Sequence, residues 1–199
     1  MRTITGFFIS FCIFLIVADG QEHKAQLLKE PASWEFERFS LPPQFAPGIS
    51  YKGFEELRFA PGMFNKDSAT YFTYAFVAEL ENIATVSQVD IRSYLQKYYK
   101  GLCSATAHDR KLEIDTTRIN VTIVKKKDTS GNEAIYDAVL NIFGVFADGA
   151  PVSLNMEIKV MVNAGLKKTY LLFIASPRQK KDAVWHDLYA IQKNFAFPD

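Results

Sequence analysis

The strongest constraint on the fold is a two-residue alternation between residues 152 and 162. The residues between its apolar positions are polar from Ser153 to Lys159, and the apolar side chains stand at every second position: Val152, Leu154, Met156, Ile158, Val160 and Val162. This period predicts a half-buried strand. Asp148-Gly149 before it predicts a tight hairpin, and Asn163-Ala164-Gly165 after it predicts another turn. Antiparallel strands joined by short turns exclude a doubly wound parallel sheet, which needs a crossover between each pair.

The same reasoning predicts the other strands. Residues 118–123 and 135–147 precede the alternating segment and residues 169–175 follow it, so the C-terminal half reads as a four-stranded meander. In the N-terminal half, strands are predicted around residues 34–37, 51–59 and 70–80. Residues 70–80 are apolar on both faces, which is typical of a central strand covered from both sides.

Two amphipathic helices complete the pattern. Thr85-x-x-Gln88 has capping-box spacing, and Ser87 is an alternative N-cap. Gly101 is expected to end this helix. A second helix is predicted over residues 182–195. The apolar faces consist of Ile91, Tyr94, Leu95, Tyr98 and Leu102 in the first helix and of Trp185, Leu188, Ile191 and Phe195 in the second. The predicted fold class is α+β: one antiparallel sheet of about six to seven strands packed by two helices.

The start of the chain predicts export. Residues 7–17 are apolar except for Ser10, and eleven residues suit a signal peptide but not a membrane-spanning helix, which needs roughly 20. Ala18-Asp19-Gly20 places small residues before a cut at Gln21. We expect a signal peptide at 1–20, a flexible leader at 21–31 and a single domain at 32–199. An uncleaved anchor is the alternative. After cleavage we expect no stable membrane span, and a periplasmic or secreted location.

Charge and cysteine content narrow the function. Loss of Arg2 and Asp19 with the signal leaves 22 basic and 21 acidic residues, a balance that argues against nucleic acid as a partner. Loss of Cys12 leaves Cys103 alone, so no intramolecular disulfide can form. Cys103 is interpreted as a small buried hydrophobe, with a reactive thiol as the alternative.

The sequence contains no recognisable catalytic or cofactor motif. The three histidines, His23, His108 and His186, fit no metal-binding spacing, and neither a serine-hydrolase elbow nor a phosphate-binding glycine loop occurs. We therefore predict no catalytic residues, no metal and no cofactor. An unrecognised hydrolase that uses Glu55, Glu56 or His186 is a minor alternative.

The segment from Tyr51 to Phe64 is the candidate binding surface. It combines aromatic, methionine and arginine side chains, which are the types that anchor interfaces. The residues predicted to contribute are Tyr51, Phe54, Glu56, Arg58, Phe59, Met63 and Phe64. The alternative is an edge strand with a well-packed loop, in which Arg58 pairs with a glutamate.

The order of elements and the closing segment from Ala183-Val184-Trp185 to Asn194-Phe195 resemble the PsbP-like family, known from the extrinsic subunit of photosystem II and its bacterial relatives. Many members end in Ser-Phe where this chain has Asn-Phe. The resemblance implies a non-catalytic binding or assembly module at membranes. Two hypotheses follow: an exported binding or assembly module with an unknown protein partner, and a carrier that holds a small apolar ligand between helix and sheet, where the 14% aromatic residues would line a cavity.

Overall fold

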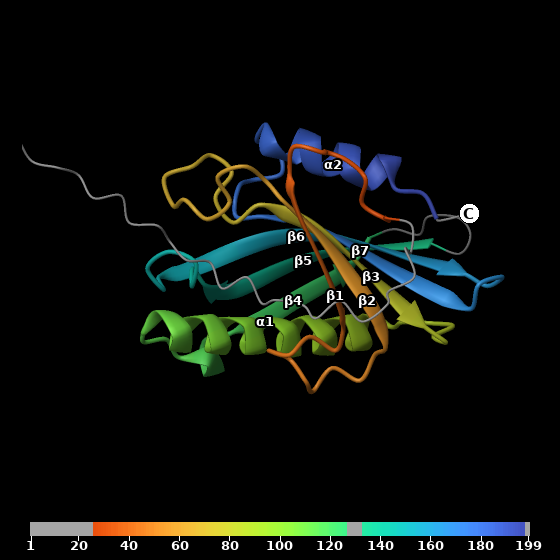
Figure 1. The fold of residues 1–199 in the computed structure, drawn as a ribbon, viewed down its shortest axis with the longest axis horizontal. Coiled ribbons are helices and arrows are strands. Elements are labelled where there is room, and N and C mark those ends of the chain that lie inside the picture. Colours follow the sequence, from red (N-terminus) through yellow and green to blue (C-terminus); the bar gives the residue numbers. More distant parts are fainter. Residues whose placement is uncertain (1–25, 127–132, 198–199) are drawn as a thin grey trace, which may run out of the picture.

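The computed structural model describes residues 26–126 and 133–197, in which one antiparallel sheet carries a helix on each face (Figure 1). The predicted signal peptide and its cleavage site lie outside the described residues. The elements are β1 (Glu35–Leu41), β2 (Gly53–Phe59), β3 (Tyr74–Glu81), α1 (Gln88–Arg110), the short 3₁₀ helix η1 (Thr116–Arg118), β4 (Asn120–Lys125), β5 (Glu133–Phe143), β6 (Pro151–Asn163), β7 (Lys168–Ser176) and α2 (Val184–Asn194).

The seven described strands lie in the order β1-β2-β3-β7-β6-β5-β4, and every pairing is antiparallel. The predicted α+β class and the four-stranded meander are confirmed. The first three strands form a second meander, which joins the first through the pairing of β3 with β7. β3 therefore lies inside the sheet and is buried on both faces, as its two-sided apolar sequence predicts.

Each face of the sheet has its own core. Alternate residues of a strand point to opposite faces, so Phe76 and Phe173 pack under α1 while Val77 and Leu172 pack under α2. On the α1 face, the rings of Phe76 and Phe173 stack with centroids 4.2 Å apart. The core on the α2 face includes Trp185, which is fully buried. The protein is thus a three-layer α/β/α arrangement with two separate cores.

The first helix begins at the alternative N-cap, Ser87, rather than with the predicted capping box at Thr85, and it ends later than predicted. Ser87 is the N-cap, and its hydroxyl accepts the Asp90 N–H at 3.2 Å while the Asp90 carboxylate accepts the Ser87 N–H at 2.9 Å. The helix does not end at Gly101 but continues to Arg110, where Lys111 adopts φ 56°. A Cβ atom at Gly101 would lie 2.0 Å from the carbonyl oxygen of Phe45. Gly101 therefore allows close packing of a loop, a contact that local sequence does not reveal.

Two more boundaries differ from expectation. β5 ends at Phe143 rather than at residue 147, and residues 144–150 form a longer loop instead of a two-residue turn. Within Asp148-Gly149 only the glycine has a positive φ, of 73°, so the type I′ turn is not formed. His108, which follows the predicted helix end at Gly101, lies in the last turn of α1.

The described end of the predicted leader packs against the protein. Leu27 and Leu28 are 6% and 2% exposed and belong to the core on the α2 face. Residues 27–34 are called the N-terminal strap below. The prediction of a loose leader therefore does not hold for these two residues, because apolar side chains and backbone hydrogen bonds fix them. Neither helix in the described part of the chain combines the length and apolarity that crossing a membrane requires.

Candidate functional site

Strand β2 divides the predicted binding surface between the two faces of the sheet. Leu57 and Phe59 belong to the core under α1, whereas Phe54 belongs to the core under α2. Glu55 therefore faces α1, and Glu56 faces the opposite side together with Arg58. The seven predicted residues do not form one continuous surface, because the period of two in an extended strand separates neighbours.

On the α2 face, Glu56 and Arg58 hold the N-terminal strap. The Glu56 carboxylate accepts the backbone N–H groups of Leu27 and Leu28 at 2.7 and 2.9 Å. The Arg58 guanidinium donates to the carbonyl oxygens of Leu28, Trp34 and Lys29, at 2.9, 2.8 and 3.2 Å. These bonds satisfy charged groups that would otherwise be buried at a high cost. Both residues thus have a structural role on this face.

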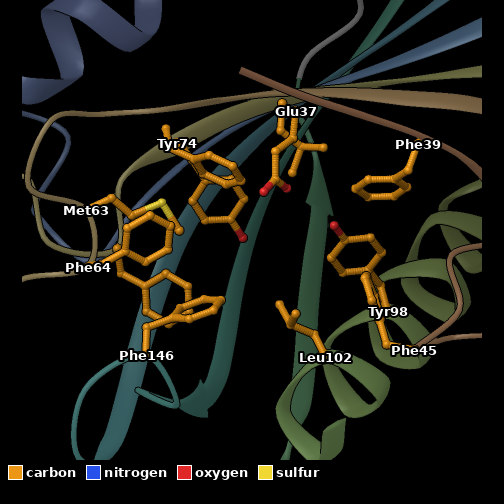
Figure 2. A pocket seen from close by; sticks show the side chains of 12 residues that line it. Glu37, Phe39, Phe45, Met63, Phe64, Tyr74, Tyr98, Leu102 and Phe146 are labelled. Atoms are coloured by element: carbon orange, nitrogen blue, oxygen red, sulfur yellow. The ribbon is translucent and has the colours of Figure 1, made fainter. Parts of the chain in front are cut away.

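On the α1 face, a pocket of about 160 Å³ lies between α1, strands β1–β3 and the loops 60–73 and 144–150 (Figure 2). Its inner wall consists of buried side chains: Leu57, Phe59, Met63, Phe72, Tyr74 and Tyr98. Its mouth consists of partly exposed ones: Glu37, Phe39, Phe45, Phe64, Leu102 and Phe146. Eight of these twelve residues are aromatic, so a guest in the pocket would be surrounded mainly by rings.

The aromatic walls pack against one another. Phe64 and Phe146 meet edge to face with centroids 5.3 Å apart on one side of the pocket. Phe45 and Tyr98 do the same at 4.9 Å on the other side. In Figure 2 the side chain of Glu37 enters between these two sides. Edge-to-face contacts fix ring orientations, so the walls support a preformed pocket.

Glu37 is the one charged side chain that lines the pocket. It lies on the edge strand β1 opposite Leu57, which points it toward α1. Burial raises the pKa of Glu37, and the negative charge of Glu35 raises it further. Its carboxylate is thus less well solvated than an exposed one, and a donor or cation in the pocket would stabilise its ionised form.

A second carboxylate is buried behind the pocket wall. Glu55 is fully buried, and neither of its oxygens makes a hydrogen bond of normal geometry. Burial raises its pKa well above 4.5, an effect that the nearby Tyr98 hydroxyl only partly offsets. The hydroxyls of Tyr74 and Tyr99 bond to each other in the same layer. Tyr74 and Tyr98 also line the pocket and so separate it from this polar cluster.

The structure places only part of the predicted site at the pocket. Phe59, Met63 and Phe64 line it. Tyr51 borders a smaller hollow of about 70 Å³ near the start of α1. The sequence analysis missed Glu37, because its alternation with Phe36 looks like a solvated strand surface. No local signal identifies the remaining lining residues, since they come from five separate segments that only the fold assembles.

The groups considered for catalysis are dispersed. Glu55 and Glu56 face opposite sides of β2, and His186 is exposed on α2. Across residues 26–126 and 133–197, no three metal-binding side chains form a cluster that could hold an ion. Cys103 is buried, which confirms its interpretation as a core residue, and burial raises the pKa of its thiol to about 11. A thiol with that pKa is a poor nucleophile at neutral pH.

In comparisons with protein families, curated proteins and solved structures, nothing matches this chain. The resemblance to the PsbP-like family therefore stays a prediction. Function has to be inferred from the pocket itself and from the residues that form it.

Proposed function

We propose that the chain is an exported binding module that holds a small, mainly apolar molecule in the pocket on the α1 face. The observation that carries this proposal is the aromatic lining of a preformed hollow between helix and sheet. Ligand pockets are typically concave, mostly apolar and furnished with few polar groups, and here Glu37 is the charged one. Of the two hypotheses from the sequence, the carrier of a small ligand fits this geometry better.

The size of the pocket limits the ligand. Its volume of about 160 Å³ is close to that of an engineered apolar cavity of about 150 Å³ that binds benzene. Pockets for drug-sized molecules are larger, roughly 300–1,000 Å³. The expected guest is therefore a molecule with one six-membered ring or an equally short alkyl group. At about 0.8 kcal/mol per buried carbon, the seven carbons of toluene contribute about 6 kcal/mol, so its Kd should be roughly 0.1 mM.

Methionine methyl groups provide a local measurement. After signal cleavage the chain keeps Met63 in the pocket, Met156 elsewhere in the same core and Met161 in the core of the opposite face. Toluene titrated into the chain labelled with ¹³C-methyl methionine should shift the Met63 signal to saturation. The Met161 signal should stay constant because the sheet separates it from the pocket.

A variant that fills the pocket is the matched control. Leu102→Trp adds a ring at the mouth from α1 and should abolish the Met63 response. Its urea unfolding should show a loss of no more than about 1–3 kcal/mol, the usual cost of overpacking. If Met63 fails to respond in the wild-type chain, or responds equally in Leu102→Trp, the pocket does not bind apolar molecules and the proposal is overturned.

Export is a separate part of the proposal with its own test. The mature chain isolated from the host's envelope or medium should begin at Gln21, as read by intact mass. A chain that retains Met1 would contradict cleavage, and with it the periplasmic or secreted location. The pocket-binding proposal would remain, because it depends on residues of the folded domain alone.

A further inference from the structure

We propose that the molecule held in the pocket is a cation: a protonated amine or quaternary ammonium group attached to a single ring or a short alkyl chain. This inference rests on the proposed function, because it names the ligand class of the same pocket. It follows from the distribution of charge around the pocket and from the arrangement of the aromatic rings.

On strands β1 and β2, the acidic and basic side chains mostly point to different faces of the sheet. Glu37 and Glu55 point toward α1, whereas Arg38 and Arg58 point to the opposite side, where they neutralise Glu56. No lysine or arginine is among the residues that line the pocket. The pocket thus has a carboxylate at its mouth, a second carboxyl group behind its wall, and no cation of its own.

Lys66, in the neighbouring loop, does not compensate for the excess of negative charge at the pocket. Its ammonium group forms an ion pair with Asp148, which joins the loops 60–73 and 144–150 beside the pocket. Glu35, on the same strand as Glu37, adds a further negative charge and raises the pKa of Glu37. A cationic guest would supply the missing counter-charge, and it would favour the ionised form of Glu37.

The rings of the pocket provide a second attraction for a cation. The faces of Phe and Tyr rings attract cations within about 6 Å of their centroids. Figure 2 shows Phe39, Tyr74 and Tyr98 around the carboxylate of Glu37. On the opposite face of the same strands, arginine side chains already make cation–π contacts of this kind. There Arg38 lies 3.9 Å from the Phe54 ring centroid and Arg58 lies 4.8 Å from that of Phe36.

A pair of matched probes tests the inference. Benzylammonium and benzyl alcohol are similar in size and share the ring, but only the first is charged at pH 7. Titrations followed at the Met63 methyl group should show benzylammonium binding at least about tenfold tighter, the gain expected from one desolvated ion pair and one cation–π contact. Raising the salt concentration from 0.05 to 0.5 M should reduce this ratio.

Glu37→Gln should bring the two affinities to within about twofold, because it removes the pocket charge that favours benzylammonium over benzyl alcohol. Glu35→Gln is the comparison variant: it removes an exposed charge on the same strand that does not line the pocket, so it should lower the preference for benzylammonium far less than Glu37→Gln. Urea unfolding of Glu35→Gln should match the wild type within about 0.5 kcal/mol, as for other exposed substitutions. Glu37→Gln should remain folded in the same assay, because glutamine has nearly the same shape as the half-buried glutamate that it replaces.

The outcomes separate the two proposals. If toluene and benzyl alcohol bind but benzylammonium binds no tighter, the cation inference is overturned and the apolar pocket stands. The inference is also overturned if Glu37→Gln keeps the tenfold preference. If none of the three probes shifts the Met63 signal, the proposed function itself fails.

Discussion

Glu55 and Glu56 are neighbours on β2, both fully buried, yet their surroundings differ in almost every respect. Glu56 accepts two backbone N–H groups, and these bonds together with two arginines partly offset the desolvation that raises its pKa. Glu55 lies among aromatic rings, with the Tyr98 hydroxyl as the one group that lowers its pKa. Two identical side chains at consecutive positions are thus buried in different ways: one has hydrogen-bond donors and cations around it, and the other has aromatic rings.

The difference separates the two faces of the sheet by how their buried charges are satisfied. On the α2 face, the Glu56 carboxylate holds the N-terminal strap, so nearly all of the buried polar groups there have partners. On the α1 face, the unsatisfied carboxyl lies behind an open aromatic pocket. A buried polar group without partners costs stability, and chains keep such groups mainly where function requires them. The contrast therefore indicates a structural role for the polar groups on the α2 face, and it supports the proposal of a binding pocket on the α1 face.

Removal of Glu56 should have the largest effect. Glu56→Ala leaves the N–H groups of Leu27 and Leu28 without an acceptor and Arg58 without a counter-charge. Loss of one partner of a buried charged network typically costs about 3–5 kcal/mol. Urea unfolding monitored by tryptophan fluorescence measures it. Glu113→Ala, exposed after α1, is the control and should change little; if Glu56→Ala is equally mild, the strap does not depend on this carboxylate.

Removal of Glu55 should have the opposite sign. Glu55→Leu replaces a buried carboxyl that lacks hydrogen bonds by an apolar side chain of similar size. The chain should become more stable by about 1–3 kcal/mol at pH 7, because the desolvation cost disappears. The same urea experiment decides the sign. A loss of more than 1 kcal/mol would show that Glu55 has a stabilising partner, and the contrast with Glu56 would disappear.

The pH dependence of stability should isolate Glu55. Its folded pKa is raised well above 4.5, so the folded chain retains a proton that the unfolded chain releases. The contribution of Glu55 to the free energy of unfolding is therefore greatest below its unfolded pKa. This contribution falls as the pH rises from there toward the folded pKa, by at most about 1.4 kcal/mol per pH unit. The pKa values of Glu37 and Glu56 are raised as well, so the useful quantity is the difference between wild type and Glu55→Gln.

Unfolding free energies measured every half unit from pH 4.5 to 8 provide that difference. The wild-type curve should fall more steeply than the Glu55→Gln curve, since glutamine cannot titrate. Parallel curves would mean that Glu55 has the same pKa in the folded and unfolded chains, and that its burial has no electrostatic cost.

Much of the fold could be predicted from the sequence because the signals are local. The alternation in residues 152–162 and the apolar run before Glu81 are periodic patterns, and they determine strand type and burial. The correct N-cap, Ser87, was among the alternatives for the same reason. Local patterns, however, do not report which distant backbone approaches a residue, so Gly101 was misread as a helix end rather than as a site of close packing.

The pocket could not be predicted from local sequence patterns, because only the assembled fold brings its lining residues together. Alternation alone places Phe59 and Glu55 on one face and Glu56 on the other, so the sequence could have divided the predicted surface. No motif predicts that Phe146 contacts Phe64 or that Tyr98 reaches the pocket. In the same way, Glu37 looks like part of a solvated edge until the pairing of β1 with β2 places it beside the pocket.

The smallest predicted effect concerns the second arginine at Glu56. Arg38 lies 3.4 Å from the carboxylate, but its side chain is 22% exposed, so solvent screens the pair. Arg38→Met keeps an apolar stem over the Phe54 ring and should cost only about 0.5–1 kcal/mol in urea unfolding, less in 1 M salt. Arg92→Met, exposed on α1, is the matched control. A loss as large as that of Glu56→Ala would mean that this ion pair, rather than the two backbone N–H bonds, satisfies Glu56, and the carboxylate would then be anchored to the edge strand instead of to the N-terminal strap.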